Sequence, residues 1–512
     1  MSKATFNAVL WSGIAAAALA LAAGCNFAPH YTPPPMASPP GYKETNGWKT
    51  AEPSDAVIKG KWWEMFNDPQ LNELEEQVAV SNQTIVAALE NFLAAREVAK
   101  QARSQLFPTI SADPSYTKGM ASAANSGNGN GNGNGNGGGF IGSNNVANAN
   151  GSSGRNLFSS YVLPLDATWE PDLWGSIRNT VAANVYTAQA TAAQLENMRL
   201  TLQAELAVDF YQLRGQDELI DLYSNTIGNY TNSLTLTKTL FETGIDSELD
   251  VAQADSLLQT TLAQATALEI QRAQFEHAIA LLVGQPASTF SLHPAPREHH
   301  PPPVPLGVPA QLLERRPDIA SAERAVAAAN ANIGVARAAY YPNVSLSAGA
   351  GYESATLAKL AQYSSFYWSA GIAASEIIFD AGRRKAATRQ AWATYRSDAA
   401  TYRETILAAF QQVEDNISAL RILSTETQQE DVAIRASQKN LDLAVERYKL
   451  GINSFLNVIT AQVSLLQNQQ ASVNIHQQQM TSAVQLIMAL GGGWDTNSLP
   501  AAKQVLHGSA GH

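Results

Sequence analysis

The stretch FETGIDSELDVAQA, residues 241–254, resembles a second stretch, YKLGINSFLNVITA, residues 448–461, and both have glycine at the fourth position. The two glycines, Gly244 and Gly451, are 207 residues apart. The same offset links two further pairs of glycines, Gly175 with Gly382 and Gly284 with Gly491. A shared spacing at three points predicts two copies of one structural plan within a single chain.

A third pair of motifs identifies an insertion in the first copy. RSQLFPTIS, residues 103–111, corresponds to RAAYYPNVS, residues 337–345, at a larger offset of 234. The extra residues coincide with the Gly/Asn-rich tract 127–150, which we therefore interpret as an inserted loop. A phosphate-binding glycine loop is the alternative, but the tract lacks the flanking strand, helix and Lys of that motif.

Alternating apolar and polar residues predict four strands, near residues 109–118, 159–170, 343–353 and 366–379. The third shows the pattern most clearly, because one face carries only apolar side chains: Val344, Leu346, Ala348, Ala350 and Tyr352. A tilted strand crosses the hydrocarbon of a membrane in about 9 to 11 residues. Four strands cannot close a barrel, and an open edge in lipid leaves backbone groups unpaired. The chain must therefore oligomerise or stay outside the membrane as a soluble sheet with one wet face.

Two proline-free stretches favour the membrane interpretation. Residues 176–240 and 383–447 each contain 65 residues without proline, enough for a helix of roughly 100 Å. A weak patch at residues 217–230 is expected to interrupt the first. The returning helix has a seam of apolar residues at three- and four-residue steps: Val251, Ala254, Leu258, Leu262, Ala265 and Leu268. Helices of this length are not typical of a compact globular bundle.

Composition and charge argue against several classes of function. The net charge of -11 disfavours a nucleic-acid binder, which needs surplus Lys and Arg. One cysteine among 512 residues provides no Cys-based metal site. His299 and His300 lie in a proline-rich connector, and a metal role there needs further ligands. Asp318 and Glu323 are expected to pair with Arg316 and Arg324. We therefore predict no enzyme activity, no metal site and no cofactor.

The first residues are typical of a secretory signal. Lys3 supplies a positive region, residues 8–23 an apolar stretch, and residues 22–24 small side chains before Cys25. This pattern resembles a bacterial lipoprotein signal, which implies that Cys25 carries an N-acyl diglyceride. An ordinary secretory signal with an incidental cysteine is the alternative. After residue 24 no apolar run of about 18 residues remains that could form a transmembrane helix.

Several motifs together resemble one known family. QLLERRPDI begins at Gln311, the alanine-rich residues 325–331 follow, and IGVARAAYYPNVS begins at Ile333. Supporting motifs are Cys25 with the prolines and Tyr31 after it, Trp62-Trp63 with FNDPQLNEL, and residues 448–462. The chain is similar over nearly all of residues 25–494 to the outer-membrane factor lipoproteins of resistance-nodulation-division (RND) efflux systems, the NodT-like branch of the TolC superfamily.

The resemblance implies an α+β membrane protein with a TolC-like fold. In that family three chains each give four strands to a 12-stranded outer-membrane β-barrel and their helices to a coiled-coil-like periplasmic tunnel. The expected partners are two identical chains, a periplasmic adaptor (membrane fusion protein), an inner-membrane RND pump and outer-membrane lipid. The resemblance also places Pro108 and Pro342 at helix-to-strand junctions, where proline is tolerated, and the Gly/Asn tract in an extracellular loop.

The resemblance assigns the turns at Gly244 and Gly451 to the periplasmic ends of the helices. The implied adaptor-docking residues lie in and beside these turns: Gly244, Ile245, Asp246, Ser247 and Leu249 with Gly451, Ile452, Asn453, Ser454 and Leu456. Plain turn chemistry explains the same residues: glycine ends one helix, and Asp246 or Asn453 with Ser247 or Ser454 caps the next. The resting aperture commonly carries aspartates in this family. The corresponding Asn457 and Thr460 are neutral, so we predict a constriction formed by Leu456 and polar side chains, with Asp250 supplying any local charge.

The expected organisation has six parts: a signal peptide at 1–24, an anchor and extended segment at 25–70, a first repeat at 71–290, a Pro-rich connector at 291–316, a second repeat at 317–494 and a flexible tail at 495–512. The predicted function is a passive exit duct for drugs or other small molecules. A duct for metal ions or for protein secretion is the alternative within this class. A periplasmic coiled-coil scaffold without a pore is the alternative outside it.

Overall fold

The computed structural model describes residues 26–36, 39, 41–43, 60–120, 157–295, 300–304 and 315–508. These residues form two compact units. The first comprises the described residues within 1–27, 101–179 and 334–387 and contains the strands, and the second contains most of the helical residues. The predicted signal peptide 1–24, Cys25 and the tract 127–150 lie outside the described residues.

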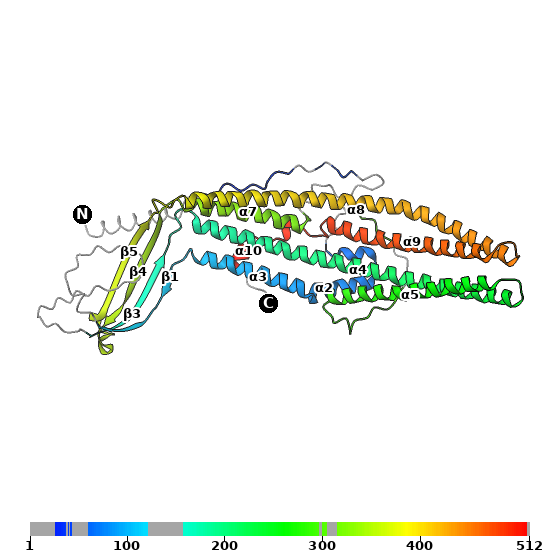
Figure 1. Ribbon diagram of the computed structural model, residues 1–512. Helices are drawn as coiled ribbons and strands as arrows, with labels where there is room; N and C mark the ends of the chain where they lie inside the picture. Colours follow the sequence, from blue (N-terminus) through cyan, green and yellow to red (C-terminus); the bar gives the residue numbers. More distant parts are fainter. Residues whose placement is uncertain are drawn as a thin grey trace. The chain divides into compact units, whose positions relative to one another are not determined.

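Four long helices form two matching pairs. α4 (Ser176–Glu242) and α8 (Arg383–Lys449) have 67 residues each, and α5 (Glu248–Leu282) and α9 (Phe455–Ala489) have 35 each. The four run side by side, with the α4–α5 and α8–α9 turns at the same end (Figure 1). Equal lengths in the two halves agree with the repeat in the sequence.

The expected interruption of α4 at residues 217–230 is wrong, because the helix is continuous there. Asp217, whose side chain would otherwise compete for backbone groups, is paired with Arg214 and Arg272. Tyr230 is buried against neighbouring helices and adds apolar contact. Tertiary contacts therefore outweigh the weak local helix propensity of this stretch.

The other helical elements are shorter. Before the first strand lie η2 (Trp62–Phe66), α2 (Pro69–Ser81) and α3 (Gln83–Ser104), and α7 (Pro317–Ala338) precedes the second pair of strands. Three single turns are η5 (Leu357–Lys359), η6 (Tyr363–Ser365) and η7 (Thr496–Ser498). No helix in the described part of the chain is long and apolar enough to cross a membrane.

The strands form one antiparallel sheet in the order β1-β3-β4-β5, with β2 also paired to β3. Their bounds are β1 (Thr109–Ser111), β2 (Ser115–Met120), β3 (Leu157–Trp169), β4 (Asn343–Ser354) and β5 (Phe366–Ser375). The central pairing joins β3 of the first repeat to β4 of the second. Within the described residues β5 pairs only with β4, and β1 and β2 pair only with β3, so both edges of the sheet are open.

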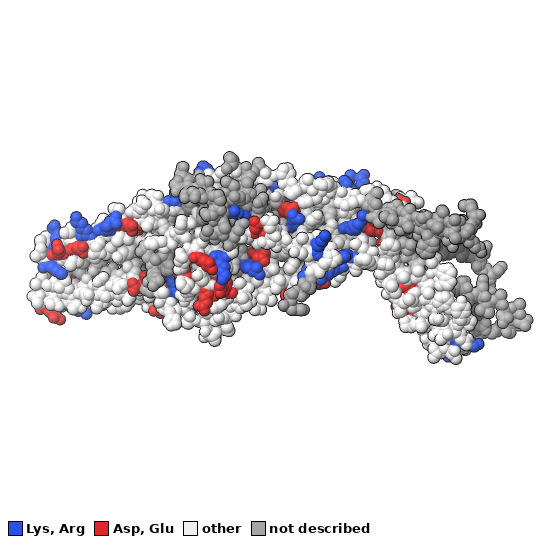
Figure 2. Space-filling model, turned by 180° about the vertical axis from the view of Figure 1, so that it is seen from behind, with Lys and Arg blue, Asp and Glu red and all other residues white. Residues whose placement is uncertain are grey.

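The register aligns the predicted apolar faces of all strands. Leu165 faces Ala350, which faces Trp368, and Ile110 and Tyr116 at the edge pair with apolar positions of β3. Trp368 and Ile372 are 72% and 74% exposed. In the view of Figure 2 the surface of the sheet is mostly free of charged side chains. One face of the sheet is therefore apolar and is not covered by other described residues.

Two expected strands differ from those observed. The strand expected near 109–118 is split, because residues 112–114 face the part of β3 that contains Pro164, and Pro114 lies in the gap. Neither proline has an N–H to donate to the ladder. The strand expected at 366–379 ends at Ser375, which pairs with Asn343, the first residue of β4. Residues after Ser375 have no residue of β4 opposite them, so the pairing cannot continue.

The tail expected to be flexible is ordered within residues 495–508. It contains η7 and α10 (Ala502–His507). Val505 is fully buried, and the Gln189 amide donates to the carbonyl of Pro500 at 2.9 Å. The composition of this segment is typical of a flexible tail, but burial of Val505 and the hydrogen bond from Gln189 hold it against the rest of the chain.

Candidate functional site

The first tip turn, residues 243–247, ends α4 with a glycine in the left-handed region. Gly244 has φ +75°, its N–H donates to the carbonyl of Phe241 at 2.9 Å, and the N–H of Ile245 donates to Leu240 at 2.9 Å. This pair of bonds satisfies the last carbonyls of the helix. A side chain is strained at such a φ, and glycine is therefore the residue that fits.

Reciprocal hydrogen bonds start α5. The Ser247 hydroxyl accepts from the backbone N–H of Asp250, and the Asp250 carboxylate accepts from the Ser247 N–H and hydroxyl. This capping box satisfies donors at the helix start. The turn chemistry predicted for Ser247 is confirmed. The Asp250 carboxylate, proposed as a charge at the aperture, is engaged in this cap.

The second tip turn, residues 450–454, repeats the glycine geometry but not the cap. The N–H groups of Gly451 and Ile452 donate to Tyr448 and Arg447 at 2.8 and 2.9 Å. Ser454 is the N-cap residue, but its side chain makes no capping bond, so the side-chain cap predicted for Ser454 is wrong. Asn457 stands where the first turn has Asp250. The acidic group that completes the first capping box is therefore missing in the second.

A hydrogen-bonded contact beside the turns joins the two halves of the repeat. The Tyr448 hydroxyl of α8 donates to the Asp246 carboxylate of the first turn, and it lies 3.4 Å from the Thr237 hydroxyl of α4. Burial and the neighbouring Asp246 raise the pKa of Tyr448, so the phenol keeps the proton that it donates. We call Thr237, Asp246 and Tyr448 the tip latch.

The tip latch breaks the internal symmetry, because the repeat places Phe241 opposite Tyr448 and Asn453 opposite Asp246. The equivalent contact would join Phe241 to Asn453, and phenylalanine has no hydroxyl to donate. Asn453 instead accepts from the Arg447 guanidinium at 3.3 Å. No role was predicted for Tyr448 from the sequence, although the difference between Phe and Tyr at this position was visible in the repeat.

Apolar side chains from all four long helices form a buried core beneath the turns. The tip core consists of Tyr230, Leu234, Ala254, Leu258, Ala444, Tyr448, Phe455, Val458 and Ala461. Tyr448 and Phe455 pack with ring centroids 5.2 Å apart. Any movement that separates the two helix pairs at this end must therefore open this core as well as the tip latch.

The predicted docking residues lie around the rim of the same end. Ile245, Leu249 and Ile452 are 68%, 65% and 60% exposed. Leu450, which the sequence analysis did not single out, is 73% exposed. The two turns and the first residues of α5 thus present four uncovered aliphatic side chains beyond the tip core.

A sequence model of the family described as outer membrane efflux protein matches residues 74–285 and 308–492, the strands, long helices and tip turns described above. The chain belongs to the outer membrane efflux protein family. It is an outer-membrane component of an efflux pump and extends into the periplasm. The family is one of transport channels.

Named relatives support this assignment over almost the whole chain. The probable efflux pump outer membrane protein TtgC of Pseudomonas putida is 30% identical over 473 residues, covering 92% of this chain and 93% of the relative. The solvent efflux pump outer membrane protein SrpC of Pseudomonas putida is 30% identical over 483 residues, covering 94% and 98%.

Solved structures share the fold. The outer-membrane channel OprN has a TM-score of 0.82 and 28% identity, covering 92% of this chain and 100% of that channel. The open state of the Neisseria gonorrhoeae MtrE channel has a TM-score of 0.75 at 24% identity, covering 92% and 99%. The TolC-like fold expected from the sequence is confirmed.

The predicted aperture residues share one exposed face of α9. Leu456, Asn457 and Thr460 are exposed, whereas Phe455 and Val458 on the other face lie in the tip core. Leu456 is 56% exposed. This chain therefore carries one large apolar side chain and two neutral polar side chains on the face of α9 that is predicted to line the aperture.

Leu456→Ala is expected to raise single-channel conductance, because it removes the largest side chain from this face. Leu249→Ala, at the equivalent position of the first repeat, is the matched control and is expected to leave conductance unchanged. Planar-bilayer recordings of both variants measure the effect. An unchanged conductance for Leu456→Ala would place the constriction elsewhere.

Proposed function

We propose that three copies of this chain close one 12-stranded barrel and form a passive exit duct for small molecules. The observation that carries the proposal is the sheet, which, among the described residues, has two open edges and an apolar face without cover. In lipid an open edge leaves backbone donors and acceptors unpaired. Pairing β5 of one copy with β1 and β2 of the next removes every edge, and such a head-to-tail contact closes into a ring.

The long helices support a duct rather than a surface pore. Each 67-residue helix reaches roughly 100 Å at 1.5 Å per residue, which suits a tunnel across the periplasm. We further propose that the exposed aliphatic residues of the two tip turns contact a periplasmic adaptor, and that an inner-membrane RND pump supplies the energy. Site-specific crosslinking from Ile245 and Ile452 tests the contact: capture of the adaptor is expected at these positions and not at exposed Val432 on α8.

The cargo is proposed from the relatives. Their names include antibiotic, solvent and toluene efflux, and we propose apolar or amphipathic organic molecules as the class exported here. Growth in the presence of toluene is compared between a strain that lacks the gene and the same strain with the gene restored, and the restored strain is expected to grow better. Equal growth would point to the metal-ion or protein-secretion alternative.

Planar bilayers test the duct itself. Purified protein is expected to have three times the mass of the chain and to produce stepwise ion currents. A folded trimer that gives no current would reject the duct and leave the coiled-coil scaffold as the better explanation.

The tip latch is proposed to hold the duct closed at its periplasmic end. Tyr448→Phe keeps the ring and removes the hydroxyl, and loss of a hydrogen bond to a charged group is worth about 1.5–3 kcal/mol. An equilibrium between closed and open tips should shift toward open roughly tenfold or more, seen as a higher open probability. Tyr223→Phe, which removes a hydrogen-bonded hydroxyl farther along α4, is the control and should leave it unchanged. Equal open probabilities for Tyr448→Phe and Tyr223→Phe would show that the tip latch does not control opening.

We also propose that Cys25 carries an N-acyl diglyceride that anchors the chain to the membrane. Mass spectrometry of the N-terminal peptide should detect the added lipid, and Cys25→Ser should abolish it. An unmodified peptide beginning before Cys25 would support the ordinary secretory signal instead.

A further inference from the structure

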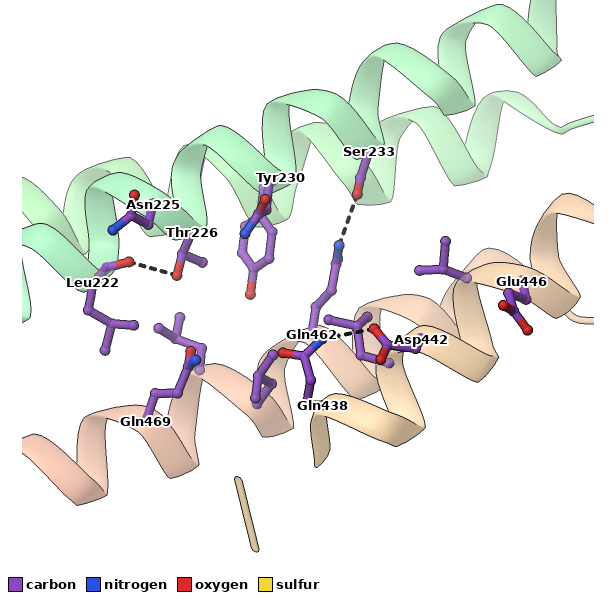
Figure 3. A pocket seen from close by; sticks show the side chains of 15 residues that line it. Leu222, Asn225, Thr226, Tyr230, Ser233, Gln438, Asp442, Glu446, Gln462 and Gln469 are labelled. Carbon is purple, nitrogen blue, oxygen red and sulfur yellow. Dashed lines mark hydrogen bonds between the residues drawn. The ribbon is translucent and has the colours of Figure 1, made fainter. Parts of the chain in front are cut away.

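A cavity of about 720 Å³ lies between α4, α8 and α9, next to the tip core and on its side away from the tip turns. Its residues come from three helices that are far apart in the sequence (Figure 3). It is separate from the tip turns, the predicted aperture residues and the sheet. None of the functions proposed above uses it.

Two buried polar atoms of this cavity have no hydrogen-bond partner within the described residues. They are the hydroxyl oxygen of Tyr230 and Oε1 of Gln462, on side chains only 3% and 6% exposed. Buried polar atoms in folded proteins are nearly always paired, and an unpaired one requires an explanation. Figure 3 shows Tyr230 pointing from α4 across the cavity toward α9, and Gln462 extending from α9 toward α4.

Neighbouring contacts fix the orientation of these groups. The Gln462 amide nitrogen donates to the Ser233 hydroxyl at 2.9 Å, which leaves Oε1 of the same amide as a free acceptor. On α8 the Gln438 amide donates to the Asp442 carboxylate at 2.8 Å. The polar groups are therefore held in place before any ligand binds, which lowers the entropy cost of binding.

The lining has a single sign of charge and an apolar wall. Asp442 and Glu446 supply two carboxylates, and none of the described residues that line the cavity is Lys, Arg or His. Leu222, Leu441 and Leu465 form part of the apolar wall. Acceptors and negative charge beside an apolar surface match a ligand that has a protonated amine and an apolar body.

We propose that this cavity is a binding site for a small amphipathic amine. Its ammonium group lies against the Asp442 and Glu446 carboxylates, its N–H groups donate to Gln462 Oε1 and the Tyr230 hydroxyl, and its apolar body packs on the leucines. This inference goes beyond the duct function, because binding at the site requires neither ion current nor a partner protein.

Binding of three indole probes to the full chain in lipid nanodiscs tests the proposal by isothermal titration calorimetry. Tryptamine is cationic at neutral pH, N-acetyltryptamine is neutral and indole-3-acetate is anionic, while the indole ring is constant. Tryptamine is expected to bind and the other two probes to bind at least tenfold more weakly, since charge-assisted hydrogen bonds are the stronger ones. Empty nanodiscs give the lipid background.

Variants distinguish this site from binding elsewhere on an acidic protein. The double substitution D442N and E446Q removes both charges at exposed positions and is expected to weaken tryptamine binding about tenfold or more. Asp431→Asn, an exposed carboxylate of α8 outside the cavity, is the matched control and should not change it.

Tyr230→Phe separates a ligand group from a structural one. Its hydroxyl has no hydrogen-bond partner among the described residues, so the substitution should leave the thermal midpoint unchanged or raised while weakening tryptamine binding severalfold. Equal affinity for the three probes, absence of binding at millimolar tryptamine, or equal affinity in the double variant and Asp431→Asn overturns the proposal. A planar-bilayer current in these same preparations reports on the duct separately.

Discussion

Replacing Asp217 by alanine is expected to lower the free energy of unfolding by about 3–5 kcal/mol, because it leaves the buried Arg214 guanidinium and the partly exposed Arg272 guanidinium without their shared partner. The Asp217 side chain is fully buried and accepts from Arg214 at 2.6 Å and from Arg272 at 2.7 Å. It also accepts from the backbone N–H of Ala295 at 3.1 Å. The substitution therefore affects α4, α5 and the start of the connector together.

Chemical denaturation of the purified protein, followed by circular dichroism of the helices, measures this loss. The control is Glu196→Ala, which removes a carboxylate that pairs with Arg199 where both side chains are about a third exposed. Exposed pairs contribute about 0–1 kcal/mol, so this variant should unfold close to the wild type. A similar small change for Asp217→Ala would show that the buried network does not stabilise the fold.

Gly491→Ala is expected to destabilise the chain by about 3 kcal/mol, from left-handed strain of about 1–2 kcal/mol and a steric clash of similar size. Gly491 has φ +95°, and an added Cβ would lie 2.1 Å from the carbonyl oxygen of Arg315. That backbone has little freedom to move, because the neighbouring Arg316 donates to the carbonyl of Ala489 at 3.1 Å and pairs with Asp318.

Gly451→Ala is the matched control for steric crowding. Gly451 also has positive φ, +70°, but an added Cβ there meets nothing within 4 Å. This variant should lose only the backbone-strain part of the free energy of unfolding, about 1–2 kcal/mol. It should therefore unfold at a clearly higher denaturant concentration than Gly491→Ala. If the two variants unfold together, close approach to Arg315 is not what requires glycine at residue 491.

Local features of the sequence determined much of this protein. The glycines at a constant offset located both tip turns, because a left-handed φ at a helix end depends on the residue itself. Alternation along 343–352 assigned the two faces of β4, since side chains of a strand alternate whatever the strand pairs with. The pairing of Arg316 with Asp318 and of Arg324 with Glu323 was predicted and is confirmed, because each pair is close along the chain.

Only the tertiary structure decided contacts between residues far apart. Whether Tyr448 reaches Asp246, 202 residues away, depends on how two helix pairs pack, and either residue alone is ordinary turn or core chemistry. The ordered tail, the continuous α4 and the cavity between α4, α8 and α9 depend in the same way on packing against distant segments. The periodicity of a sequence reports which side of an element is apolar, but the neighbour that covers that side is selected by the free energy of the whole fold.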